Sequence, residues 1–175
     1  MIFSNNNITI AIIEDAASIK YLLDRAYRGE SSKKGWTSET HLIAGEVRTN
    51  IEMVTEAITN QDGNMLVYKK DNLNFGCVHL KEIDQKIYLG MFAVEPDLQG
   101  GGIGREILKA AEEYTKQKKL NTIYMTVISV RKELIDWYKR NGYQETGEII
   151  DFNEDEVTGK HLQKLKFLVL EKRLK

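Results

Sequence analysis

The stretch QGGGIGRE, Gln99–Glu106, places four of the chain's thirteen glycines within six residues and runs directly into an amphipathic helical pattern. The apolar run Ile87–Val94 lies just before it and indicates a strand. A helix N-terminus has unpaired N–H groups and about half a positive charge, and glycines let the backbone close around an anion. The order of strand, glycine loop and helix therefore favours a phosphate-binding loop. A tight turn that binds nothing is the alternative.

Three common phosphate-binding loops do not fit the spacing of these glycines. No glycine is followed by Lys and then Ser or Thr, so the Walker pattern fails. The dinucleotide pattern G-x-G-x-x-G fails because Arg105 or Ile107 stands where its third glycine belongs. The H-R-D and D-F-G elements of a protein kinase are absent. The spacing that remains is Gln99-x-x-Gly102-x-Gly104.

The rest of the chain indicates an α+β fold, with a mixed, mostly antiparallel sheet and helices on its faces. Short turns between the middle strands indicate an antiparallel meander, and the helix after the glycine loop leads into a parallel crossover. Asp15 can cap the first helix, and a short helix is expected near Ser38. The expected strands are 8–13, 65–68, 75–80, 87–94, 121–127, 143–150 and 164–174, and the expected longer helices begin after Asp15 and span about 51–59, 103–118 and 133–140.

The bulk composition is that of a globular domain, and we expect residues 1–175 to form one. With 25 basic and 26 acidic residues the net charge is −1, which gives no reason to expect nucleic-acid binding. No apolar run is long enough to span a membrane, and the N-terminus lacks the pattern of a signal peptide. The single Cys77 fits a reducing compartment, so a cytoplasmic location is expected.

The loop spacing and a second motif, ELIDWYKRNGY at Glu133–Tyr143, together resemble the GNAT superfamily of N-acetyltransferases. The resemblance covers nearly the whole chain in the expected order and implies a GNAT-type fold that binds acetyl-CoA. One departure concerns Arg131, which stands where many relatives have an asparagine that contacts the cofactor. Arg131 could instead reach a phosphate of coenzyme A, or it could be an ordinary solvated arginine.

The resemblance also implies which residues hold acetyl-CoA. The backbone of the glycine loop would bind the pyrophosphate, and the backbone of the preceding strand would pair with the pantetheine arm and help to stabilise the oxyanion. The residues implied as cofactor-binding are Phe92, Ala93, Val94, Gln99, Gly100, Gly101, Gly102, Ile103, Gly104, Arg105 and Arg131.

The implied reaction moves the acetyl group directly to an amine, without a covalent enzyme intermediate. Tyr138 matches the family tyrosine that protonates the leaving thiolate, although an aromatic side chain there could simply pack. Glu95, directly after the central strand, is the first candidate to accept the amine's proton through water, and its alternative is a surface carboxylate. Glu52, Glu39 and His41 are weaker candidates.

The acceptor is expected opposite the cofactor, over the segment KKGWTSETHL, where Trp36, Thr37 and His41 offer an aromatic wall and polar groups. The sequence thus predicts a small-molecule amine or amino-acid-like acceptor, with no nucleic-acid or membrane partner. A protein or peptide N-acetyltransferase and a non-catalytic acyl-CoA sensor are the alternatives. The three histidines lack metal-ligand spacing, so no metal is expected. A homodimer is left open.

Overall fold

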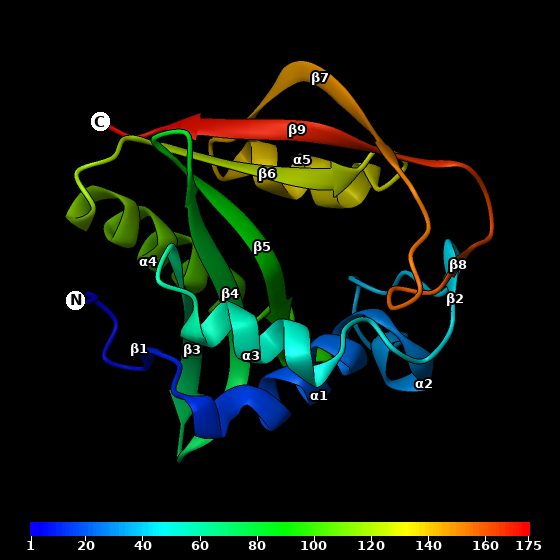
Figure 1. The fold of residues 1–175 in the computed structure, drawn as a ribbon, viewed down its shortest axis with the longest axis horizontal. Coiled ribbons are helices and arrows are strands. Elements are labelled where there is room, and N and C mark those ends of the chain that lie inside the picture. The colour runs from blue at the N-terminus through cyan, green and yellow to red at the C-terminus, as the bar shows by residue number, and fades with distance from the viewer.

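The computed structural model describes residues 1–175, and its centre is a seven-stranded sheet (Figure 1). Neighbouring strands are antiparallel except for one parallel pair, β5 with β6. The chain that connects these two strands contains the glycine loop and the helix that follows it. In sheet order the strands are β1 (Ile8–Ile10), β3 (Gly63–Lys70), β4 (Leu73–Ile83), β5 (Lys86–Val94), β6 (Thr122–Ile128), β9 (Leu165–Arg173) and β7 (Gln144–Phe152).

Helices cover both faces of this sheet, so the α+β fold expected from the sequence is the one observed (Figure 1). One apolar core joins α1 and α3 to β3 and β4, and a larger one joins α4 and α5 to the other face. Successive residues of β3 alternate between the two cores, as strand geometry requires: Met65 and Val67 enter the first, and Leu66 enters the second. The helices are α1 (Ala16–Tyr27), α2 (Gly29–Ser32), α3 (Ile51–Thr59), α4 (Ile103–Gln117) and α5 (Lys132–Arg140), with 3-10 turns at Ile13–Asp15 and Pro96–Leu98.

Two local expectations are wrong. The carboxylate of Asp15 does not cap α1: it accepts the Ile12 N–H at 3.0 Å and pairs with Lys69, because the chain turns through a 3-10 segment before the helix starts. The short helix lies at Gly29–Ser32 rather than near Ser38. A small two-stranded sheet, β2 (Ile43–Ala44) with β8 (Lys160–His161), has no counterpart in the sequence patterns.

The parallel pair at the centre of the sheet splits soon after it begins. β5 and β6 pair at Ile87 with Ile123 and at Tyr88 with Tyr124, and no further (Figure 1). Beyond this point β5 contains one extra residue relative to β4, and Met91 has a left-handed φ of 44°. Such a bulge bends its strand. The bend of β5 therefore accompanies a wedge-shaped opening between the two strands.

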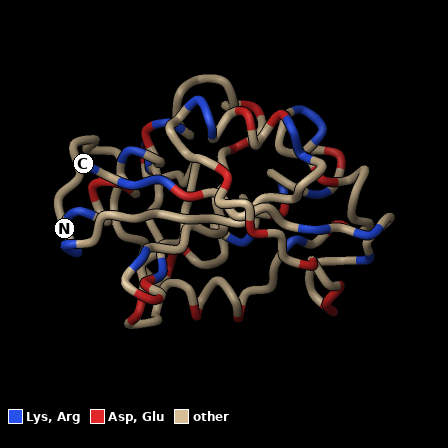
Figure 2. Tube along the Cα trace, turned by 90° about the horizontal axis from the view of Figure 1, so that it is seen from above, with Lys and Arg blue, Asp and Glu red and all other residues tan.

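Basic and acidic residues are interspersed along the Cα trace (Figure 2). This mixing agrees with the 25 basic and 26 acidic residues of the chain. None of the helices combines the length and the hydropathy that a membrane-spanning segment would need.

Candidate functional site

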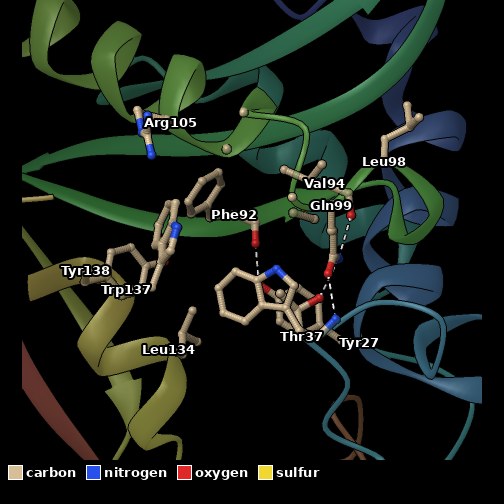
Figure 3. Close-up of a pocket in the computed structure, with 15 residues that line it drawn as sticks. Tyr27, Thr37, Phe92, Val94, Leu98, Gln99, Arg105, Leu134, Trp137 and Tyr138 are labelled. Carbon is tan, nitrogen blue, oxygen red and sulfur yellow. Dashed lines mark hydrogen bonds between the residues drawn. The ribbon is translucent and has the colours of Figure 1, made fainter. Parts of the chain in front are cut away.

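A cavity of about 210 Å³ lies where β5 ends and α4 begins (Figure 3). Its walls come from the end of β5, the glycine loop Gln99–Gly104, the start of α4, one side of α5, and the end of α1 with the segment that follows it. Among the residues that the sequence predicts for the cofactor, those lining this cavity are Phe92, Ala93, Val94, Gln99, Gly100, Gly102, Gly104 and Arg105. Gly101 and Ile103 belong to the same loop without lining the cavity.

The glycine loop presents unpaired backbone donors to this cavity. Gly100 and Gly102 have φ values of 87° and 92°, in the left-handed region that favours glycine, and a Cβ at either would meet no atom within 4 Å. Gly102 is the N-cap of α4 and offers no side-chain cap. The N–H groups of Gly102, Ile103 and Gly104 bond to no backbone acceptor. The loop therefore has donors and open space for an anion such as phosphate.

The side chain of Gln99 joins the glycine loop to two other segments (Figure 3). Its oxygen accepts the N–H of Trp36 at 2.8 Å, and its nitrogen donates to Thr37 Oγ1 at 2.8 Å and to the Val94 carbonyl at 3.0 Å. A Cβ at Gly35 would lie 2.4 Å from the Gln99 oxygen, so a side chain at this position would displace the Gln99 amide. Gln99 thus holds the Trp36–Thr37 segment against the end of β5.

Arg131 holds the same segment from the opposite side. Its guanidinium donates to the carbonyls of Trp36 at 3.1 Å and Thr37 at 3.2 Å, and it also pairs with Glu133. Only 1% of Arg131 is exposed, and it does not line the cavity at the glycine loop. The structure therefore places Arg131 in neither of the expected settings. It is not solvated, and its donors are already bonded within the protein.

An aromatic cluster forms the floor between the two splayed strands. The ring of Trp137 lies 5.9 Å from that of Trp36 and 6.1 Å from that of Phe92, between centroids. Tyr138 packs edge-on against Trp137 at 5.0 Å. These distances are those of favourable aromatic pairs, so the rings stabilise the wall of the cavity as well as shaping it.

A second cavity of about 200 Å³ lies on the other side of these rings. It is bounded by β5, β6, the start of α3 and α5, and its charged wall residues are Glu39, Arg48 and Arg131. Four residues line both cavities: Tyr27, Phe92, Leu134 and Tyr138. A group passing from a ligand in one cavity to a ligand in the other would cross at these four side chains.

Tyr138 is the titratable residue of α5 at this junction. It is 5% exposed, and burial is the main cause that raises the pKa of its hydroxyl well above 10, with the nearby Tyr27 and Tyr143 adding to the effect. The phenol consequently keeps its proton throughout the neutral range and can serve only as an acid there. Its packing role and a proton-donating role are compatible, because the ring is fixed by Trp137 and Tyr143.

The carboxylates near the site are all engaged with arginines. Glu95 pairs with Arg25, whose Nε lies 3.1 Å from Glu95 Oε1, and Glu95 lines neither cavity. Glu39 lines the second cavity and is 6% exposed, with Arg28 Nη1 at 2.6 Å from its Oε2. Among the weaker candidates of the sequence, Glu39 is therefore the one brought to the site, and the exposed Glu52 is not.

The three residues predicted for the acceptor separate in the structure. Trp36 and Thr37 line the cavity at the glycine loop rather than the second cavity, and His41 is exposed and lines neither. Tyr27 and Arg48 are among the wall residues that sequence reasoning missed. Tyr27 lies four residues after Leu23, on the same face of the first helix, so helical periodicity could have identified it. Arg48 lies in a polar segment that has no helical or strand periodicity.

Comparison with known proteins agrees with this geometry. Residues 37–159 match the model of the acetyltransferase (GNAT) domain family. The spermine/spermidine N(1)-acetyltransferase of Bacillus subtilis (strain 168) is 31% identical over 104 residues, which are 55% of this chain and 68% of that protein. The chain belongs to the GNAT acetyltransferase family. It is an acyltransferase, as the sequence resemblance implied.

Solved structures show the same fold at lower identity. The ribosomal-protein-alanine N-acetyltransferase of Brucella melitensis is 18% identical, with a TM-score of 0.71 over 95% of this chain and 99% of that chain. The PaiA N-acetyltransferase of Thermoplasma acidophilum, crystallised with coenzyme A, is 19% identical, with a TM-score of 0.63 over 95% and 98%. The expected α+β GNAT fold is thus confirmed, and proteins of this family use acetyl-CoA.

Proposed function

We propose that this chain transfers an acetyl group from acetyl-CoA directly to the primary amine of a small metabolite or an amino-acid-like acceptor. The observation that carries the proposal is the position of Tyr138, in the wall between a cavity with free loop N–H groups and a second, largely apolar cavity whose wall includes Glu39, Arg48 and Arg131. This arrangement suits two substrates that meet at one buried acid.

The glycine loop would hold the pyrophosphate of acetyl-CoA through the N–H groups at the start of α4. Several hydrogen bonds to a charged group, at about 1.5–3 kcal/mol each, anchor such a ligand without a lysine. Phe92, Ala93 and Val94 line the same cavity and would lie along the pantetheine arm. The thioester supplies an activated acetyl group, and the chain's task is to orient it and to manage two protons.

Tyr138 would supply the first of these protons. Burial raises the pKa of the Tyr138 hydroxyl, so the phenol is protonated in the neutral range and has a proton to give to the leaving thiolate. The hydroxyl donates its proton as the carbon–sulfur bond breaks. The backbone near Phe92 would offer a donor for the oxyanion that forms beforehand.

The second proton leaves the attacking amine. Glu95, which directly follows β5, remains our proposal for its acceptor. Because Glu95 lines neither cavity, it would have to work through water, and its pairing with Arg25 keeps the carboxylate in place. Glu39 is the carboxylate in the wall of the second cavity, but Arg28 binds it at 2.6 Å. A water-mediated route suits a carboxylate that stands back from the substrate.

The size of the second cavity supports a small acceptor. Its volume of about 200 Å³ is below the roughly 300–1,000 Å³ typical of sites for drug-sized ligands. The Bacillus subtilis relative is named for spermine and spermidine, and the Brucella melitensis neighbour for an alanine of a ribosomal protein. Both names specify N-acetylation, but one acceptor is a polyamine and the other belongs to a protein. They therefore support the type of reaction and not a particular substrate.

Release of free coenzyme A thiol from acetyl-CoA, measured with a broad panel of amines and peptides, tests the proposal. We expect thiol release with small amines, together with a product heavier by one acetyl group and no acetylated enzyme in the mass spectrum. Faster turnover of peptides than of metabolites would favour the protein acetyltransferase. Binding of acetyl-CoA without thiol release for any amine would contradict catalysis and favour a sensor.

A further inference from the structure

The electrostatics of the second cavity are set by arginines. Its charged wall residues are Arg48, Arg131 and Glu39, which leaves a formal excess of one positive charge. Glu39 is also neutralised from behind, because Arg28 Nη1 lies 2.6 Å from its carboxylate and is itself buried. An acceptor with several ammonium groups would find no free carboxylate in this wall.

The two arginines of the wall differ in how many of their N–H donors are already bonded within the protein. Arg131 is committed to the carbonyls of Trp36 and Thr37 and to Glu133. Arg48 has no such commitment: its Nε is buried without a hydrogen-bond partner, and its ion-pair contact, to Glu39 Oε2, is 3.9 Å long and beyond hydrogen-bond distance. A buried donor without a partner is costly, and a ligand that accepts from it removes the cost.

Arg48 is nevertheless held in place. Its guanidinium lies 5.6 Å from the ring centroid of Tyr27, within the range of a cation–π contact, and its backbone N–H donates to Asp24 at 2.6 Å. Tyr27 in turn donates through its hydroxyl to the Phe92 carbonyl and lines both cavities. Arg48 therefore has a fixed position next to the residues that separate the two cavities, while its Nε still lacks an acceptor.

In the acidic segment that follows β7, Asp155 lies close enough for the charge of Arg48 to act on it, but the carboxylates of this segment are held by their own loop. Asp155 accepts the N–H groups of Val157 at 2.8 Å and Thr158 at 2.6 Å, and Glu154 accepts the N–H of His161 at 2.7 Å. Neither carboxylate lines the second cavity. Both are used to shape their own loop.

We propose that Arg48 binds a carboxylate of the acceptor, so that the preferred substrates are amines that also carry a carboxylate, as amino acids do, rather than polyamines. This inference rests on the proposed acetyltransferase function and names the substrate class of the same site. Arginine suits the role because its planar fork of N–H groups matches a carboxylate.

The test compares each protein amino acid with its decarboxylated counterpart, such as lysine with cadaverine, so that the two members of a pair differ only in the carboxylate. Spermidine is added as a polyamine. We expect the carboxylate to raise kcat/KM by roughly tenfold to a hundredfold in the native protein, and Arg48→Gln to abolish most of that preference through KM. Lys109→Gln removes the same charge from an exposed site that forms no ion pair, and should leave the preference unchanged.

Equal or faster turnover of spermidine and the decarboxylated amines, or the same loss in Arg48→Gln for both members of each pair, would overturn the inference. Calorimetry of the same ligands against the coenzyme A-loaded protein keeps the two proposals distinguishable. If no amine is acetylated, the proposed function fails. Weaker amino-acid binding in Arg48→Gln would still support the carboxylate site, and unchanged or absent binding would refute it.

Discussion

Gln99 and Arg131 bind opposite sides of one peptide segment, the first through the Trp36 N–H at 2.8 Å and the second through the Trp36 carbonyl at 3.1 Å. The two residues come from the glycine loop and from the start of α5, which follow the two diverging strands of the central split. The Trp36–Thr37 segment therefore connects the two sides of the opening. Gln99 and Arg131 both hold it, and the Thr37 hydroxyl adds a hydrogen bond to the Ala26 carbonyl at 2.9 Å.

Replacing Gln99 with Ala should release one side of this segment. Three hydrogen bonds are lost, at about 1 kcal/mol each at most, so the free energy of unfolding should fall by about 1–3 kcal/mol. KM for acetyl-CoA should rise as well, because the segment lines the same cavity. Thermal denaturation and thiol-release kinetics measure both effects, and an unchanged melting temperature would show that Gln99 does not fix the segment.

Gly102→Val should weaken acetyl-CoA binding severely. The residue has a φ of 92°, which a β-branched side chain adopts with strain, and the added side chain would occupy the space open to a phosphate. Gly147→Val is a matched control: its φ is 90°, its Cβ would also meet nothing within 4 Å, and it lies in β7, away from the cavity. Comparable loss of acetyl-CoA affinity by calorimetry in both variants would argue against a phosphate site at Gly102.

Tyr138→Phe should lower kcat by about a hundredfold while leaving the affinity for coenzyme A nearly unchanged, since only the donated proton is removed. Tyr143→Phe provides the control. Tyr143 is also buried, its hydroxyl has no partner, and its ring packs against Tyr138 at 5.7 Å. Equal turnover in the native protein and in Tyr138→Phe, or equal losses in the two variants, would remove the catalytic role.

Glu95→Gln should reduce turnover more at pH 7 than at pH 9, because at higher pH more of the amine is already unprotonated and needs no acceptor. Arg25→Gln is the companion variant: it breaks the same ion pair and leaves the carboxylate in place. A pH–rate profile distinguishes the two. Parallel profiles, with the same loss for both variants at every pH, would identify Glu95 as a structural partner of Arg25.

Stability should decline in alkali partly through Cys77. Burial raises the pKa of its thiol from 9.0 to about 12, so between these values the unfolded chain has lost a proton that the folded one retains. The unfolding free energy therefore falls as pH rises, with Cys77 contributing up to about 1.4 kcal/mol per pH unit. The unfolding free energy, measured by urea titration at several pH values from 8 to 11, should fall less steeply with pH for Cys77→Ala than for the native protein. Identical slopes would contradict the buried thiol.

Local patterns in the sequence were sufficient for most of the fold. The helix expected at about residues 51–59 is observed as α3, Ile51–Thr59, and the glycine loop opens α4. The split between β5 and β6 was not visible, because it depends on strand pairing and on a bulge at Met91 rather than on residue type. The same limit applies to β2 and β8, which pair across more than a hundred residues.

Side-chain roles at the site were harder to predict than its location. The loop and Tyr138 could be found because motif spacing and a family resemblance point to them. The directions of the Glu95 and Arg131 side chains could not, since each is fixed by a partner distant in sequence: Arg25 for Glu95, and the Trp36–Thr37 carbonyls for Arg131. Arg48 was not predicted for a similar reason: the residues around it come from segments distant in sequence, which the fold brings together at the second cavity.

The divergence of β5 from β6 creates a strand edge in the interior of a sheet, where unpaired carbonyls would otherwise invite another strand to add. Side chains take the place of the missing strand. The Tyr27 hydroxyl bonds the Phe92 carbonyl, and the Gln99 amide bonds the Val94 carbonyl. These two carbonyls at the open edge of β5 are therefore already bonded and do not offer acceptors to another strand.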